Sequence, residues 1–109
     1  MNKHDLIVAL ADLPGAINLA EITIIEAQAN VTKAKETLSA KEADLYTENK
    51  IDGKNAEIRA AQLRQFTTQE RNDIAKVENI LSLARIQYNL LQNHFSAYRA
   101  IAAMMKAGE

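Results

Sequence analysis

The reactive side chains of this chain limit the chemistry that it can perform. Its 109 residues include two histidines and no cysteine. His4 and His94 lie far apart, and neither has a second histidine or a carboxylate at the three- or four-residue spacing of a helical metal site. This excludes thiolate chemistry and the histidine–carboxylate pairs of di-iron bundles. For His94, beside a predicted core, we expect an interhelical hydrogen bond and not a catalytic role.

Carboxylates are common but are interspersed with lysines, as on the solvated faces of helices. A pair of carboxylates for acid and base catalysis would need a pocket that raises one pKa, and no segment is predicted to build one. The serines lack the spacing of a nucleophile elbow, and three glycines are too few for a phosphate-binding loop. We therefore predict that the chain is not an enzyme and holds no metal or cofactor.

Basic side chains are the remaining candidates for contacts with phosphate or with a partner. Three fall in a predicted connector and three along one edge of a predicted final helix: Lys54, Arg59, Arg64, Arg85, Arg99 and Lys106. The net charge is −1, so no strong overall field draws the chain to nucleic acid. The pattern favours a solvated surface, and phosphate binding stays an alternative.

The final helix is predicted over residues 68–107 from an unbroken alternation of three- and four-residue steps between apolar residues. This spacing places them on one face of a helix that needs another helix to cover it. The core seam consists of Ile74, Val77, Leu81, Ala84, Tyr88, Leu91, Phe95, Tyr98, Ala102 and Met105.

A second seam predicts another long helix over residues 14–49. Its apolar positions are Ile17, Ala20, Ile24, Ala27, Val31, Ala34 and Leu38. Alanine occupies one core column, which allows a neighbouring helix to approach closely. Pro14 disfavours helix at the residue before it, so a separate short helix is predicted over residues 3–12.

The connector is predicted over residues 50–66. Asp52-Gly53 is a turn signal in which glycine is able to take a positive φ, and Asn55 is placed to cap a short helix. We expect this helix to turn Ile58, Leu63 and Phe66 inward and Arg59 and Arg64 outward. Thr67 and Glu70 have the spacing of a capping box that begins the final helix.

These elements predict an all-α, single-domain chain over residues 1–109: a long antiparallel, coiled-coil-like helical hairpin whose short first helix folds toward Ile101–Met105. The apolar stripe of the final helix is wider than one partner helix can cover. Its further members are Ile80, Leu83, Leu90, Ile101 and Met104. We therefore expect a homo-oligomer.

The stretch from Gly53 to Leu63 reads Gly-Lys-Asn-Ala-Glu-Ile-Arg-Ala-Ala-Gln-Leu. It resembles a segment of small, all-helical, uncharacterised bacteriophage proteins from early or recombination regions. The resemblance covers about a tenth of the chain and implies an intracellular role in an infected bacterium. It brings no catalytic residues with it.

Three functions follow from these observations. The first is a non-enzymatic phage adaptor or inhibitor that binds a host or phage protein of DNA metabolism or defence. The second is a nucleic-acid accessory or nucleotide-sequestering protein, and the third is a scaffold or chaperone for particle assembly. The resemblance implies a cytoplasmic location, in the host bacterium if the chain is phage-encoded, and the lack of cysteine fits a reducing compartment. We also find no segment of eighteen uncharged residues to span a membrane.

Overall fold

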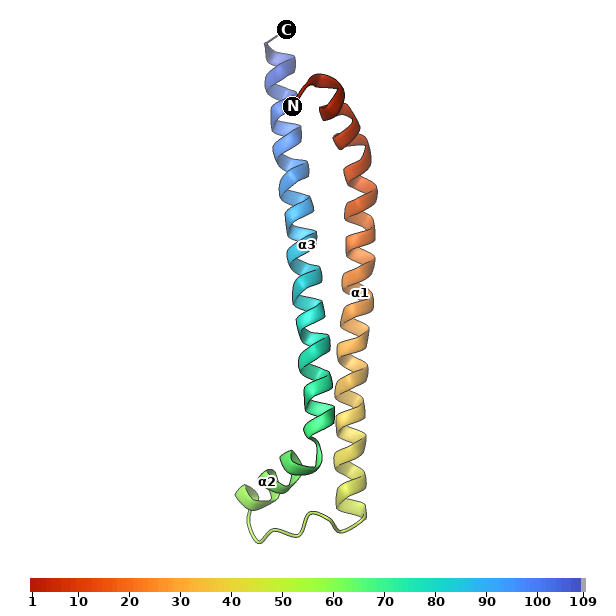
Figure 1. Ribbon diagram of the computed structural model, residues 1–109, viewed down its shortest axis with the longest axis vertical. Coiled ribbons are helices and arrows are strands. Elements are labelled where there is room, and N and C mark those ends of the chain that lie inside the picture. The colour runs from red at the N-terminus through yellow and green to blue at the C-terminus, as the bar shows by residue number, and fades with distance from the viewer. Residues whose placement is uncertain (109) are drawn as a thin grey trace. The chain divides into compact units, whose positions relative to one another are not determined.

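The computed structural model describes residues 1–108, which contain three helices and no strand (Figure 1). These are α1 (Lys3–Thr47), α2 (Ala56–Phe66) and α3 (Thr68–Ala107). The all-α class is confirmed, as is the pairing of two long helices. The bounds of α3 match the predicted range of 68–107.

The chain divides into two compact units, and α1 and α3 each contribute to both. Unit 1 combines Met1–Glu26 with the part of α3 from Ser82 onward, and unit 2 is Ala27–Leu81. The grouping of all residues into one domain stays a prediction.

α1 begins at a side-chain cap. Asn2 Oδ1 accepts a hydrogen bond from the Asp5 amide at 2.8 Å, and the Asn2 carbonyl accepts one from the Leu6 amide at 3.1 Å. These bonds satisfy amides that have no partner inside the helix. The predicted start near Lys3 is therefore confirmed, with Asn2 as its cap.

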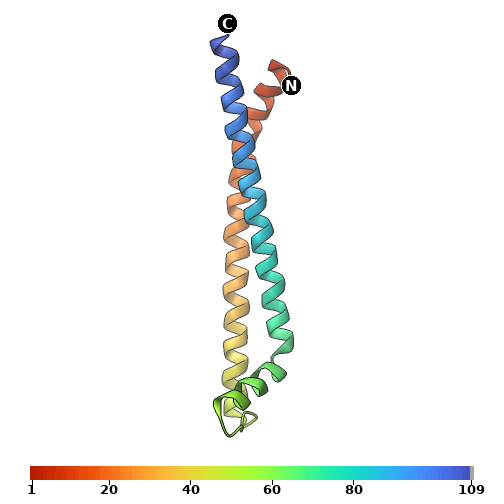
Figure 2. The ribbon, with the colours of Figure 1, turned by 90° about the vertical axis from the view of Figure 1, so that its left-hand side faces the viewer.

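The predicted break at Pro14 is wrong. There is no separate short N-terminal helix over 3–12, because α1 continues through Pro14 to Thr47. Proline removes an amide donor and crowds the carbonyl four residues earlier, which bends a helix without ending it when packing holds both sides. Leu6 and Ile17, on either side of Pro14, are both buried. Figure 2 shows the first turns of α1 leaning away from the turns that follow.

In unit 1, α1 and α3 pack in opposite directions. Leu6 lines the same pocket as Met105, whereas Glu21, further along α1, contacts Tyr88, earlier in α3. Ile17, Ala20 and Ala84 are buried in this unit. Small residues in both helices allow the backbones to approach closely, as the sequence predicted. The predicted seam of α3 is buried or half-buried up to Ala102, and only Met105 is exposed.

Unit 2 contains the second part of α1, the connecting loop, α2 and the start of α3. Its buried apolar residues are Ala27, Val31, Leu45, Ile51 and Leu81. Figures 1 and 2 show α2 lying crosswise at the end of α1. An exposed ion pair between Lys35 and Glu78, at 3.9 Å, also joins the two long helices in this unit. Such a pair adds little stability.

α1 ends in a left-handed residue. Asn49 has φ 57°, the amide of Asn49 donates to Tyr46 O, and the amide of Lys50 donates to Leu45 O at 2.9 Å. This is the pattern of a Schellman cap with asparagine in the place of glycine. Gly53, for which the turn signal allows a positive φ, does not have one, and the left-handed residue of this segment is Asn49.

The predicted capping box at Thr67 is also wrong. α2 ends directly before Thr67, so the Thr67 amide donates to Arg64 O, and its hydroxyl donates to Leu63 O at 2.6 Å. Both groups therefore serve the end of α2. Arg71 Nε donates to the same hydroxyl at 2.9 Å, and Thr67 is fully buried.

Candidate interaction surface

The connector in unit 2, residues 48–66, is held by hydrogen bonds between its own residues. Gln62 Oε1 accepts from the amides of Asp52 and Gly53 at 3.2 and 2.9 Å, and Gln62 Nε2 donates to Asp52 Oδ1 at 2.7 Å. Asn55 Oδ1 caps α2 by accepting from the Ile58 amide at 2.9 Å, as predicted. No pattern in the sequence indicates that Gln62 bonds to loop residues nine and ten positions before it.

Arg59 does not point outward as expected. Its guanidinium donates to the carbonyl of Gly53 at 3.1 Å, and the residue is half-buried. Arg59, Gln62, Asn55 and Gly53 all belong to the segment with the phage resemblance. Their side chains and backbones are thus used to build the connector.

The inward orientation predicted for α2 is only partly correct. Leu63 is half-buried, but Ile58 and Phe66 are 46% and 43% exposed. α2 has eleven residues and none of them is buried by its contacts in this chain. A crosswise helix of this length covers its neighbours with one short patch and leaves the rest of its apolar surface in solvent.

The basic residues form no single cluster. Lys54 and Arg64 are exposed in unit 2, where Arg59 bonds to the backbone. In unit 1, Arg85, Arg99 and Lys106 are exposed on α3, spaced fourteen and seven residues apart. That spacing corresponds to about 21 and 10 Å along the helix. Phosphate binding by these six residues stays a prediction.

Two of these basic side chains also have contacts of their own. The guanidinium of Arg99 lies 5.7 Å from the centre of the Phe95 ring. Arg85 has a contact of its own and is not free. Next to this edge, Tyr88 OH donates to Glu21 Oε1 at 3.3 Å and accepts from Gln92 Nε2 at 2.8 Å. The hydrogen bond of Tyr88 therefore joins α3 to α1 beside this edge.

His94 differs from its prediction. It is exposed and stacks on Tyr98 of its own helix, with ring centroids 6.1 Å apart, and does not bond across the helices. Tyr98 is half-buried in the seam, so His94 covers its ring.

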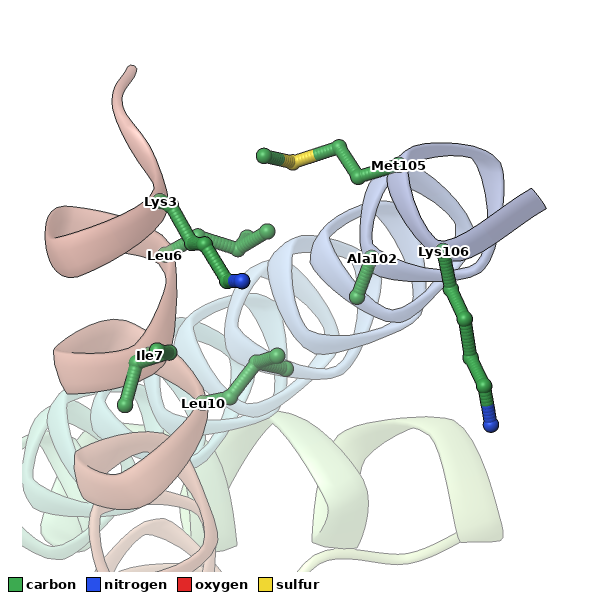
Figure 3. A pocket seen from close by; sticks show the side chains of 7 residues that line it. All are labelled: Lys3, Leu6, Ile7, Leu10, Ala102, Met105 and Lys106. Atoms are coloured by element: carbon green, nitrogen blue, oxygen red, sulfur yellow. The ribbon is translucent and has the colours of Figure 1, made fainter. Parts of the chain in front are cut away.

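An apolar pocket lies in unit 1 between the start of α1 and the end of α3. It has a volume of about 280 Å³ and is lined by Lys3, Leu6, Ile7, Leu10, Ala102, Met105 and Lys106. Figure 3 shows Leu10 pointing toward α3 and Met105 reaching back toward α1. This volume is just below the range of about 300–1,000 Å³ for small-molecule sites. It is suited to one or two apolar side chains from another helix.

α3 carries a second apolar face outside the hairpin. We define the α3 outer stripe as the exposed residues Leu83, Ile86, Leu90, Ile101 and Met104. Met104 is 73% exposed and Ile86 is 62% exposed. The prediction that α1 alone cannot cover the apolar width of α3 is therefore correct.

α1 carries a matching face that the sequence analysis missed. We define the α1 outer stripe as the exposed residues Val8, Leu19, Ile22 and Ile25. Ile22 lies two residues from both Ala20 and Ile24, which places it on the opposite side of the helix from the core. The sequence signal for this face is the spacing of Val8, Leu19 and Ile22, with Ala11 and Gly15 between them, in steps of three and four residues. The core seam of α1 has the same kind of spacing.

Length and composition also allow α1 to cross a membrane. An 18-residue window near its N-terminus has a mean hydropathy of 1.5 and no more than two charged residues. The prediction that no segment could span a membrane required eighteen uncharged residues. The window in α1 meets a criterion that accepts up to two charged residues. Core helices of soluble proteins and signal sequences meet the same criterion, so the window does not assign a location.

No protein-family model, no curated protein and no solved structure matches this chain.

Proposed function

We propose that this chain is a non-enzymatic helical adaptor or inhibitor that binds another protein through the α1 outer stripe. The observation that carries the proposal is the exposure of Leu19 and Ile25, at 65% and 67%, on a helix whose other face is already packed. Contiguous exposed apolar residues of this size mark sites of protein contact.

Acidic residues accompany this stripe. Asp12 lies four residues after Val8, Glu26 lies four residues after Ile22, and Asp5 lies three residues before Val8. Side chains at these spacings are neighbours on a helix surface. The unit 1 part of α1, residues 3–26, has four acidic residues and one lysine. The matching partner is therefore a helix with an apolar stripe bordered by lysine or arginine.

A basic partner agrees with the class of protein proposed from the phage resemblance. Proteins of DNA metabolism carry basic surfaces that contact phosphate. An acidic, apolar helix attracts such a surface and repels nucleic acid itself. These charges favour a protein partner over direct binding of nucleic acid or nucleotide. They also favour a host or phage protein of DNA metabolism or defence as the partner over a role in particle assembly.

The proposal is tested by affinity capture from phage-infected bacterial lysate, followed by titration of the purified partner. We expect Leu19→Ser with Ile22→Ser to weaken binding at least about tenfold, because each buried branched side chain contributes about 1.5–3 kcal/mol. Asp12→Asn with Glu26→Gln should weaken binding less and flatten its dependence on salt.

The matched control is Ile80→Ser, which makes the same kind of change at an exposed residue of α3 outside the α3 outer stripe. It should bind the partner as the parent chain does. Equal capture by the parent and the α1 double variant, or a partner whose contact surface is acidic, would contradict the proposal.

A further inference from the structure

The α3 outer stripe has the spacing of a helix-pairing seam. Steps of three and four residues lead from Leu83 through Ile86, Leu90, Asn93 and Ala97 to Ile101 and Met104. All seven are exposed. A repeat of this kind over three turns and more is the pattern by which one helix packs along another.

The stripe and the basic residues lie on opposite edges of the α3 core face. Leu83 and Leu90 each directly precede a core residue, whereas Arg85 and Arg99 each directly follow one. Each step of one residue rotates a side chain by about 100° around the helix axis, so residues before and after a core residue lie on opposite sides of it. The stripe is therefore free of charge, and its neighbours Gln87, Asn93 and Ala97 are uncharged as well.

Absence of charge favours contact between identical surfaces. In a two-fold dimer the same patch meets itself, so a patch that carries charges of one sign brings like charges together. The α1 outer stripe, with Asp12 and Glu26 beside it, would repel its own copy. The α3 outer stripe has no such penalty and suits a second copy of this chain.

The exposed area also fits a dimer. The accessible surface is 7853 Å². A folded monomer of 12.1 kDa is expected to expose about 6,000 Å², so the excess is roughly 1,800 Å². A stable dimer buries about 800 Å² on each partner. The excess is large enough for this interface and for a second protein contact.

We propose that the α3 outer stripe of one copy packs against the α3 outer stripe of a second copy to form a two-fold dimer. Unit 1 then contributes two helices from each copy to a four-helix arrangement with the stripes at its centre. The dimer goes beyond the proposed function, because it needs no other protein and uses a different helix.

The first test measures the molar mass of the full chain by light scattering during size-exclusion chromatography. The parent should have twice the 12.1 kDa of one chain. Ile86→Glu with Leu90→Glu should be monomeric with the helical circular dichroism of the parent. The matched control, Asn89→Glu with Ser96→Glu, adds the same charge at exposed positions that directly follow core residues, and it should stay dimeric.

The second test does not depend on a destabilising variant. The chain has no cysteine, so Asn93→Cys introduces a single thiol at the middle of the stripe. Under mild oxidation it should form a disulfide-linked dimer within minutes, and Ser96→Cys should form at least tenfold less. The dimer would be overturned by a monomeric parent, whether or not that parent binds phosphatidylcholine vesicles. Equal crosslinking of the two cysteine variants would overturn it as well. Each of these results would leave the adaptor proposal standing.

Discussion

Ile58 lies so close to Gly53 that no side chain fits at residue 53. A Cβ built on Gly53 would lie 2.5 Å from Ile58 Cγ2 and 3.0 Å from the Arg59 backbone nitrogen. The contact joins the loop to the first turn of α2. Gly53 is thus required for space and not for a positive φ.

Gly53→Ala should destabilise the chain by about 1–3 kcal/mol, because the first turn of α2 must move to admit the new methyl group. Urea unfolding at fixed protein concentration, followed by circular dichroism, measures this change. Gly15→Ala is the matched control, since its Cβ would meet nothing within 4 Å. In the middle of α1 it should stabilise the chain by about 1 kcal/mol. Equal effects of the two substitutions would refute the assigned role of Gly53.

Gln62→Ala should cost about 1–3 kcal/mol, because it leaves the amides of Asp52 and Gly53 and one Asp52 oxygen without their partner. Gln62→Glu keeps an acceptor but places a carboxylate where Nε2 now donates to Asp52. Its deficit relative to the parent should become smaller as the sodium chloride concentration is raised, since salt screens the repulsion between the two carboxylates. A deficit that is independent of salt would contradict this geometry.

Leu6→Ala should cost about 2–4 kcal/mol, because Leu6 is 3% exposed against the end of α3. Pro14→Ala restores an amide donor and favours a straight helix. If the bend at Pro14 is what brings Leu6 into contact, then Leu6→Ala should cost less in a Pro14→Ala background. A double-mutant cycle measures this coupling, and strict additivity would show that the bend and the burial of Leu6 are independent.

Thr67→Val should cost about 1–2 kcal/mol, because it removes the hydroxyl that donates to Leu63 O and accepts from Arg71 Nε while keeping the buried shape. Thr67→Ser keeps the hydroxyl and should retain more stability than the valine variant. Thermal unfolding of both variants is the measurement. The assignment fails if valine is as stable as threonine.

Heptad spacing predicted the long helices well, because burial along a helix repeats every three or four residues and needs no knowledge of distant contacts. Tyr88 and Leu91 are half-buried and Ala84 is buried, as their positions in the seam require. The same rule predicted that Leu83 and Met104 would exceed the reach of one partner helix, and both are exposed.

The predicted break at Pro14 is wrong because the low helix propensity of proline does not include the burial of its neighbours in the helix. Proline disfavours a continuous helix by about 3 kcal/mol, but buried residues on both sides of it, such as Leu6 and Ile17, stabilise the helix by more. The size of that burial depends on α3, which begins more than fifty residues after Pro14 in the sequence.

The connector was the least predictable part. Its helix and the Asn55 cap follow from local rules, and both are present. The hydrogen bonds of Gln62 and Arg59 depend on the path of the loop after α1, which no local rule specifies. The α1 outer stripe has a signal in the spacing of Val8, Leu19 and Ile22, but which apolar face of α1 packs against α3 depends on contacts that are distant in the sequence.

The hydrogen bonds that hold the connector join residues no more than ten apart, whereas Tyr88 and Glu21 are sixty-seven apart. Closing a short loop loses less chain entropy than closing a long one. The connector can therefore nucleate folding while both long helices are still separate, with their pairing spreading outward from it. On this order of events, the pocket between Leu6 and Met105 is the last part to close and the first to open.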